Sequence, residues 1–207
     1  MAWSFAANYP HQTERLVVLN CPHPRAFQKA LQENRQQLRR SWYIFYFQIP
    51  CLPELGLRVF RRRFIAQAFR GMAVRKEAFP DEELHKYAEA LGTPGSARAA
   101  INYYRAAFRH RLRHGAIHLP RISSPTLLIW GEEDTALGKE LTYDMDGYFG
   151  DRFEIKYIPK CSHWVQQEQP ELVNRYLLEF LLAEESKGEA APSPQSASTQ
   201  AASSGSG

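Results

Sequence analysis

The sequence is short of cysteine, and the cysteines it has are not arranged for a metal or for disulfides. Cys21, Cys51 and Cys161 are the only three among 207 residues, and none of them belongs to a CxxC pair. An odd number without such spacing predicts neither a zinc site nor a disulfide framework. It fits a reducing, cytoplasmic compartment in which the thiols are small buried side chains.

Long apolar runs are also missing. The most apolar window, residues 41–57, is interrupted by Gln48, Pro50, Pro53 and Glu54. It cannot supply the run of about 20 apolar residues that a membrane-spanning helix needs. The sequence also starts without the basic region and apolar stretch of a secretory signal. A soluble protein with no membrane span is therefore predicted.

An excess of charge of one sign is the third absence. The chain has 26 Lys and Arg against 22 Asp and Glu, a net charge of +4, and 44% of its residues are hydrophobic. Such a small excess does not indicate a nucleic-acid partner. The run Arg61–Arg63 and the arginines from Arg105 to Arg113 are typical of solvated helix faces.

What the sequence does contain is a pattern of short apolar strands alternating with amphipathic helices, typical of an α/β protein with a parallel sheet. Strands are expected at residues 14–20, 125–130 and 153–158, and helices at residues 1–9, 138–149 and 170–183. The first helix has Trp3, Phe5 and Ala6 on one side. The last helix is expected to turn inward Leu172, Tyr176, Leu177, Phe180 and Leu181.

Composition divides the chain into three parts. Residues 1–24 and 120–185 carry the predicted strands and form the expected α/β core. Residues 25–119 are arginine-rich with helical periodicity, and they are expected to form a helical lid inserted between the first two strands. Residues 186–207 are rich in Ala, Ser, Pro and Gly, so a disordered low-complexity tail is predicted there.

Two polar side chains follow predicted strands at their carboxyl ends. Asp134 comes just after the strand at 125–130, and His163 just after the strand at 153–158. Ligands of open α/β sheets bind at this edge. An acid that orients an imidazole, with the imidazole activating water, is the arrangement of a hydrolase. The alternative interpretation is a loop aspartate that caps a turn beside a partly exposed histidine.

Five segments, in this order, resemble the epoxide hydrolases of the α/β-hydrolase fold. They are ANYPHQTERLVVLNCPHP (7–24), SWYIFYFQIP (41–50), INYYRAAFR (101–109), PTLLIWGEED (125–134) and CSHWVQQEQP (161–170). The resemblance implies a partial α/β-hydrolase sheet with an inserted helical lid. It also implies the conversion of a small-molecule epoxide and water to a vicinal diol through an alkyl-enzyme ester, with no metal or organic cofactor.

The resemblance also assigns roles to residues. It implies that Tyr43 and Tyr104 donate hydrogen bonds to the epoxide oxygen, and that Asp134 and His163 activate the water that hydrolyses the ester. A phenol, with an ordinary pKa of about 10, stays protonated near neutral pH and can donate to a developing alkoxide.

Neighbouring aromatic residues leave alternatives open. Tyr46 is an alternative to Tyr43 as the first donor, and Tyr103 is an alternative to Tyr104 as the second. Trp164, Phe47, Trp42 and Tyr46 are candidates for the substrate pocket, and packing in the core is an equal interpretation of them.

One part of the family pattern is absent from the sequence. The resemblance implies an aspartate nucleophile in an HDWGG-like turn and an oxyanion hole that includes an HGxP-like loop, and the 207 residues contain neither motif. We expect the chain to be truncated one or two residues after the nucleophile turn and to lack activity alone. Exposed strand edges would then favour association through the incomplete sheet.

Two other functions remain open. A haloalkane or haloacetate dehalogenase would share the aspartate nucleophile and the His–Asp pair. Its lid, however, typically stabilises halide with tryptophan, asparagine or histidine rather than with two tyrosines. The other alternative is a non-catalytic remnant that binds another chain or an apolar ligand through its aromatic lid.

Overall fold

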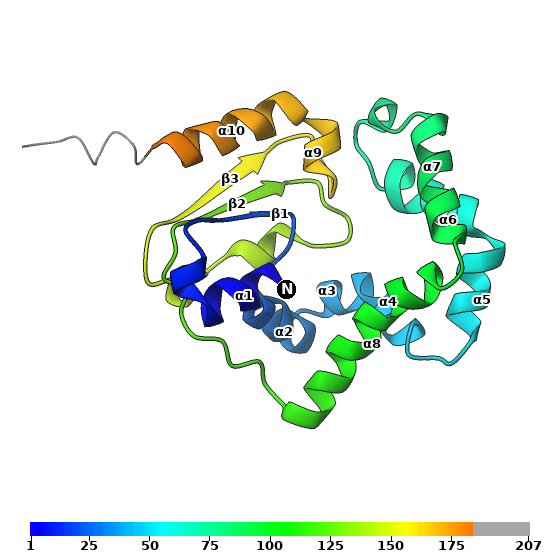
Figure 1. Ribbon diagram of the computed structural model, residues 1–207, viewed down its shortest axis with the longest axis horizontal. Helices are drawn as coiled ribbons and strands as arrows, with labels where there is room; N and C mark the ends of the chain where they lie inside the picture. Colours follow the sequence, from blue (N-terminus) through cyan, green and yellow to red (C-terminus); the bar gives the residue numbers. More distant parts are fainter. Residues whose placement is uncertain (184–207) are drawn as a thin grey trace, which may run out of the picture.

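A three-stranded parallel sheet organises the molecule. The computed structural model describes residues 1–183, so the predicted tail lies outside the described residues. The strands are β1 (Leu16–Leu19), β2 (Thr126–Gly131) and β3 (Phe153–Ile158), in the order β1-β2-β3 (Figure 1). Leu16 pairs with Thr126, and Thr126 pairs with Phe153. All three carboxyl ends therefore meet at one edge of the sheet, as the sequence predicts.

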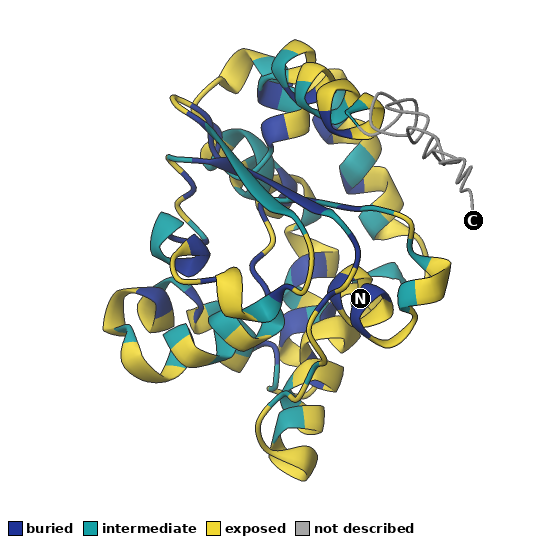
Figure 2. Cartoon of the chain, turned by 90° about the vertical axis from the view of Figure 1, so that its left-hand side faces the viewer, coloured by how far each residue is buried: buried dark blue, intermediate teal, exposed yellow. Residues whose placement is uncertain are grey.

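Helices cover both faces of this sheet. Every residue of β2 is buried, because successive side chains point to opposite faces and both faces are covered. On one face, Leu128 and Trp130 pack with Trp3 of α1 (Ala2–Asn8). On the other, Leu127 and Ile129 pack with α9 (Val165–Glu168) and α10 (Pro170–Leu182). Figure 2 shows buried positions along the strands and exposed positions on the outer faces of the helices.

A helical insert, residues 24–114, separates β1 from β2, and most of it lies beyond the carboxyl ends of the strands (Figure 1). Its elements are α2 (Pro24–Glu33), α3 (Arg35–Arg40), α4 (Trp42–Tyr46), α5 (Leu52–Val59), α6 (Arg61–Ala66), a π turn (Gln67–Gly71), a 3-10 turn (Lys76–Ala78), α7 (Asp81–Gly92) and α8 (Ser96–His114). None of the helices within residues 1–183 combines the length and the hydropathy of a membrane-spanning segment.

One arginine of α8 is not solvated, so the interpretation of its arginines as a solvated face is wrong at Arg105. Its side chain is buried and donates to the carbonyl oxygens of Phe47 (2.8 Å) and Ile49 (2.8 Å) and to the carboxylate of Glu54. A buried guanidinium is tolerated because all of these acceptors are in place. Arg105 thereby fixes α8 against the end of α4 and the start of α5.

The continuous helix predicted at residues 138–149 is wrong. The structure has two 3-10 turns there, Lys139–Thr142 and Asp146–Tyr148, and Asp144 between them has a φ of 54°. A left-handed residue ends a helix. Leu141, Met145 and Phe149 still pack under the sheet, so the helical spacing reflects burial without a regular helix.

The prediction of buried cysteines is correct only for Cys161. Cys21 and Cys51 are exposed, and all three are free thiols. Cys21 follows the end of β1 and Cys51 precedes α5. Both positions lie in connecting segments, which run over the surface of a protein.

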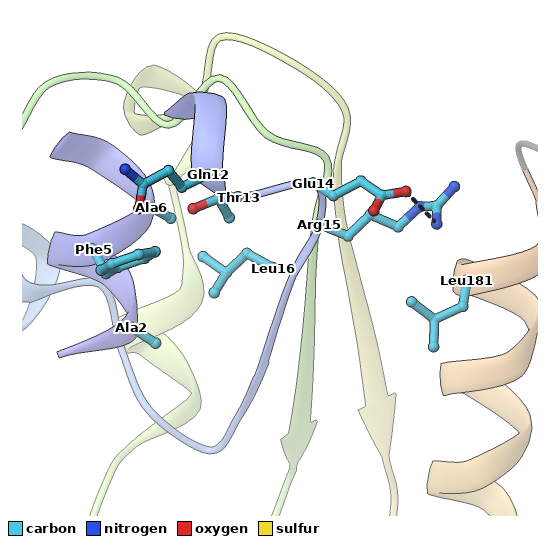
Figure 3. A pocket seen from close by; sticks show the side chains of 9 residues that line it. All are labelled: Ala2, Phe5, Ala6, Gln12, Thr13, Glu14, Arg15, Leu16 and Leu181. Carbon is cyan, nitrogen blue, oxygen red and sulfur yellow. Dashed lines mark ion pairs between the residues drawn. The ribbon is translucent and has the colours of Figure 1, made fainter. Parts of the chain in front are cut away.

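One apolar side chain predicted to face inward, Leu181, is instead exposed, and the exposed Phe5 lines the same groove. Phe5 of α1 is 47% exposed and Leu181 of α10 is 41% exposed. Both line a groove of about 490 Å³ beside β1. Figure 3 shows this groove, with Ala2, Phe5, Ala6, Gln12, Thr13, Glu14, Arg15, Leu16 and Leu181 around it. Among the described strands, β1 pairs only with β2, so the groove follows the sheet's outer edge.

His23, which precedes α2, is a buried histidine. Its Nδ1 accepts a hydrogen bond from the backbone N–H of Arg25 (3.3 Å), and its ring stacks on Tyr148 at 4.4 Å. Burial, helped by the charge of Arg25, lowers the pKa of His23 to about 4. The folded protein therefore holds a neutral imidazole where an unfolded chain holds one with a pKa of 6.5.

This pKa shift predicts acid sensitivity. Between pH 6.5 and 4 the unfolded chain binds a proton that folded His23 does not, so the free energy of unfolding should fall as the pH falls through this window. Above pH 6.5 the imidazole of His23 is neutral in both states, and the full stability is present. The loss of unfolding free energy reaches about 3 kcal/mol once the pH is below the folded pKa of about 4. His23→Asn, which keeps an acceptor for the Arg25 N–H, should flatten the dependence measured by urea denaturation. An equal flattening in His85→Asn, at a partly exposed histidine, would contradict the assignment.

Candidate active site

An acid and a histidine meet at the carboxyl edge of the sheet. Asp134 follows β2 and His163 follows β3, and Nδ1 of His163 lies 2.7 Å from Oδ2 of Asp134. The Asp134 side chain is fully buried, whereas that of His163 is 24% exposed. Donation from Nδ1 to the carboxylate leaves the lone pair on Nε2. The arrangement can orient an imidazole that takes a proton from water.

The carboxylate of Asp134 is held on every side. Its Oδ1 accepts from the backbone N–H groups of Ala136 (2.8 Å) and Leu137 (2.9 Å), and its Oδ2 also accepts from Nδ2 of Asn20 (2.8 Å). Four donors therefore hold one carboxylate in a single orientation. Two of these four donors belong to the loop that follows β2.

Asn20 is a site residue that sequence reasoning missed. It is buried directly after β1, with a φ of 41° that asparagine tolerates. Its Oδ1 accepts from the N–H of Gly131 (2.9 Å) while its Nδ2 donates to Asp134. One amide thus joins the ends of β1 and β2 to the acid. Its position directly after an apolar strand could have identified Asn20 as a candidate, because the same position identified Asp134.

Two tyrosines of the helical insert pack against each other, and the charge of Asp134 acts on one of them, Tyr43. The rings of Tyr43 in α4 and Tyr104 in α8 meet edge to face with centroids 5.5 Å apart, and Phe47 contacts both. Burial raises the pKa of both phenols, and the charges of Tyr104 and Asp134 raise that of Tyr43 further. Both hydroxyls therefore stay protonated and can donate hydrogen bonds near neutral pH.

The alternatives to these tyrosines lie elsewhere. Tyr46 directs its hydroxyl toward Gly56 of α5, where an added Cβ would be 3.4 Å from the oxygen. Tyr103 is 63% exposed, against 36% for Tyr104. Trp42, a candidate for the pocket, is largely exposed and packs on Tyr46 with centroids 5.9 Å apart.

Trp164 joins the His163 loop to the helical insert. Its indole stacks on Phe69 at 4.3 Å, and Nε1 donates to the carbonyl oxygen of Ala68 (2.9 Å). The same ring meets His163 edge to face at 4.9 Å. Trp164 therefore contacts both the histidine and the insert.

A buried carboxylate makes a second connection between these parts. Glu168 of α9 accepts from the backbone N–H groups of Val74 (2.9 Å) and Arg75 (2.8 Å) in the insert. It also accepts from the N–H (3.0 Å) and hydroxyl of Ser162, the residue before His163. Sequence reasoning missed Glu168, because no local pattern shows that its partners are backbone groups far along the chain.

Gln37 of α3 makes the equivalent connection to the Asp134 loop. Its side chain is fully buried, donates to the carbonyl oxygen of Ala136 (3.0 Å) and to Ser41, and accepts from the N–H of Gly138 (3.0 Å). Glu168 and Gln37 together attach the insert to the two loops that carry His163 and Asp134. Among residues 1–183, no group of three or more His, Cys, Asp or Glu is placed to hold a metal ion.

Comparison with known proteins identifies relatives, although no protein-family model matches the chain. Epoxide hydrolase 4 of Homo sapiens is 32% identical over 193 residues, which cover 90% of this chain and 52% of the human protein. Epoxide hydrolase 2 of Caenorhabditis elegans is 32% identical over 188 residues, which cover 87% of this chain and 51% of the nematode protein. The chain thus spans about half the length of these relatives.

Solved structures share the fold. An epoxide hydrolase of Bacillus megaterium in complex with an inhibitor matches with a TM-score of 0.71 at 24% identity, covering 86% of this chain and 64% of that one. An epoxide hydrolase from metagenomes of hot environments matches with a TM-score of 0.65 at 26% identity, covering 87% and 63%. The predicted α/β-hydrolase fold is confirmed. Sequence and fold together identify the chain as a relative of the epoxide hydrolases of the α/β-hydrolase fold.

Proposed function

We propose that the chain carries the phenol donors and the water-activating pair of an epoxide hydrolase, which converts an epoxide and water to a vicinal diol. The observation that carries the proposal is the 2.7 Å contact between His163 and Asp134 beside the packed pair Tyr43 and Tyr104. An acid–imidazole pair alone is common to many hydrolases. Two protonated phenols, one of them within the electrostatic influence of Asp134, fit a substrate whose oxygen gains negative charge as its ring opens.

The proposed reaction has two steps. A carboxylate attacks an epoxide carbon, the C–O bond breaks, and the Tyr43 and Tyr104 hydroxyls donate hydrogen bonds to the resulting alkoxide, which takes up a proton from solvent. In the second step Nε2 of His163 removes a proton from water, which attacks the ester carbonyl and releases the diol and the carboxylate. Asp134 stabilises the imidazolium that forms, and the imidazolium then returns its proton to solvent, which balances the proton taken up in the first step.

The proposed reaction needs an attacking carboxylate, and the sequence has no HDWGG-like turn to supply it. The test uses a fusion of this chain with the part of human Epoxide hydrolase 4 that it does not match. The two parts are joined in the order in which they occur in the human protein. The fusion should form diol from an aryl epoxide, and the 207-residue chain alone should not. Diol formed by the chain alone and lost in His163→Ala would place the nucleophile within this chain.

Tyr104→Phe tests the choice of substrate. In the fusion, it should lower kcat/KM for an aryl epoxide about 10²-fold or more, because one donor to the developing alkoxide is lost. Tyr103→Phe, at the exposed neighbouring position, should keep the parent value. Turnover of a haloalkane that survives in Tyr104→Phe, with no epoxide turnover in the parent, would favour the dehalogenase instead.

We propose further that the helical insert acts as the lid of the site, held down by Gln37 and Glu168. Its position beyond the strand ends supports this role, because ligands of such sheets bind at that edge. A cytoplasmic location is supported by the three free thiols, which a reducing compartment maintains. No nucleic-acid partner is proposed.

Association through the edge of β1 is the last part of the proposal. The groove beside β1 supports it, because Phe5 and Leu181 expose apolar surface next to a strand that pairs on one side only within residues 1–183. The unmatched part of Epoxide hydrolase 4, supplied as a separate polypeptide, should bind the chain and restore diol formation. Binding without diol formation would favour the non-catalytic remnant.

A further inference from the structure

The helical insert exposes an apolar stripe at the rim of the molecule farthest from the sheet. Leu52, Leu55 and Val59 of α5 are 51%, 59% and 58% exposed, and Phe60 directly after the helix is 63% exposed. Figure 1 shows α5 at the outer edge of the insert. Single exposed apolar residues are ordinary, but a continuous group of large ones marks a surface that contacts something.

The geometry of α5 puts these side chains on one face. Residues three and four apart share a side of a helix, so Leu52, Leu55 and Val59 form a single line. The opposite face carries Pro53 and Leu57, which are buried against the rest of the insert. The exposed stripe is therefore a second apolar face, which the protein's own core does not use.

Exposed positive charge lies next to this stripe along the chain. Arg58, Arg62 and Arg63 are exposed within or directly after α5, and residues 55–76 contain no Asp or Glu. Across the whole helical insert the sequence has 18 Lys and Arg against seven Asp and Glu. The modest net charge of the chain thus conceals a strongly basic insert.

A basic pocket adjoins the same helix. It has a volume of about 430 Å³ and is lined by Gln48, Pro50, Cys51, Glu54, Arg98, Arg105 and Arg109. Arg105 donates hydrogen bonds to the carboxylate of Glu54, whereas Arg98 and Arg109 are exposed. Cys51 and Glu54 belong to the side of α5 next to the stripe. An anionic group could therefore enter the pocket while apolar groups contact the stripe.

We infer that the α5 face, defined as Leu52, Leu55, Val59 and Phe60 with Arg58, Arg62 and Arg63, docks on the surface of an anionic lipid bilayer. An apolar stripe flanked by arginines matches the boundary between acyl chains and anionic headgroups. A second copy of the chain fits less well, because self-pairing would bring the arginines of both copies together. Docking of this kind requires no membrane-spanning helix.

Vesicle sedimentation with the 207-residue chain tests the inference, with no measurement of activity. Binding should be stronger to vesicles that contain phosphatidylserine than to vesicles of phosphatidylcholine alone, and it should weaken as salt rises. Leu55→Ser/Val59→Ser and Arg62→Gln/Arg63→Gln should each lower the partition coefficient about tenfold.

Two matched variants separate this face from the rest of the surface. Leu178→Ser/Leu182→Ser removes two leucines of α10 that are 58% and 56% exposed, and Arg35→Gln/Arg39→Gln removes the same charge from exposed positions of α3. Both should bind like the parent. Equal losses in the matched variants would overturn the inference in favour of general electrostatic attraction. A dimer that the Leu55→Ser/Val59→Ser variant abolishes, without vesicle binding by the parent, would overturn it in favour of self-association.

Discussion

Gly131→Ala should lower the free energy of unfolding by about 3 kcal/mol. Gly131 ends β2, and a Cβ there would lie 2.1 Å from the carbonyl oxygen of Ser162 and 2.6 Å from that of Cys161. Both contacts are backbone atoms of the segment that precedes His163, so no side chain can rotate away to relieve them. The His163 loop must move, and urea denaturation should register the cost.

Gly147→Ala is the matched control for this prediction. A Cβ at Gly147 meets nothing within 4 Å, and the change should alter the free energy of unfolding by no more than about 0.5 kcal/mol. Similar losses in both variants would show that the approach of the His163 loop to β2 is looser than the structure indicates.

The sheet and the acid–histidine pair could be predicted because strand patterns are local. The run from Thr126 to Trp130 is long and apolar enough to require burial on both faces, and β3 has the residue bounds expected. Parallel strands place their carboxyl ends together, which brings Asp134 and His163 to one edge without further information. The parallel order of the strands is enough to predict that these two residues meet, and no knowledge of side-chain contacts is needed.

The residues that hold this pair in place could not be predicted in the same way. Asn20, Gln37 and Glu168 form hydrogen bonds to partners 93 to 114 residues away. Their partners include backbone N–H groups, which leave no mark on the sequence at the other end of the bond. A buried polar side chain becomes identifiable only when the tertiary structure shows how it is satisfied.

The error at Leu181 has a different origin. Helical periodicity identifies apolar faces correctly, but it does not state what covers them. Leu181 follows the expected spacing, and it lies with Phe5 in the groove beside β1, where no described strand covers them. Arg105 is the opposite case, because a charged residue on a basic helix is buried where α4 and α5 supply its acceptors.

Asp134→Asn should have the largest effect on catalysis. In the fusion it should lower kcat for diol formation about 10³-fold or more, by analogy with the loss when the buried acid of a serine hydrolase triad becomes an amide. An asparagine would present an NH2 group to at least one of the donors that now surround the carboxylate. The imidazole would lose its acceptor at Nδ1, and Nε2 would no longer be held as the base. Glu133→Gln, at the exposed neighbouring acid, should keep the parent rate.

The two-step reaction makes this prediction sharper than a loss of rate. If the pair acts only on the ester, Asp134→Asn and His163→Ala should still form the ester and then fail to hydrolyse it. Mass spectrometry of either variant after incubation with the epoxide should then show one equivalent of covalent adduct, which the parent fusion clears. Tyr104→Phe should show no such accumulation, because it slows the step that forms the ester. Loss of activity without adduct in the His163 and Asp134 variants would mean that the pair is needed before ring opening, and its assignment to water activation would then be wrong.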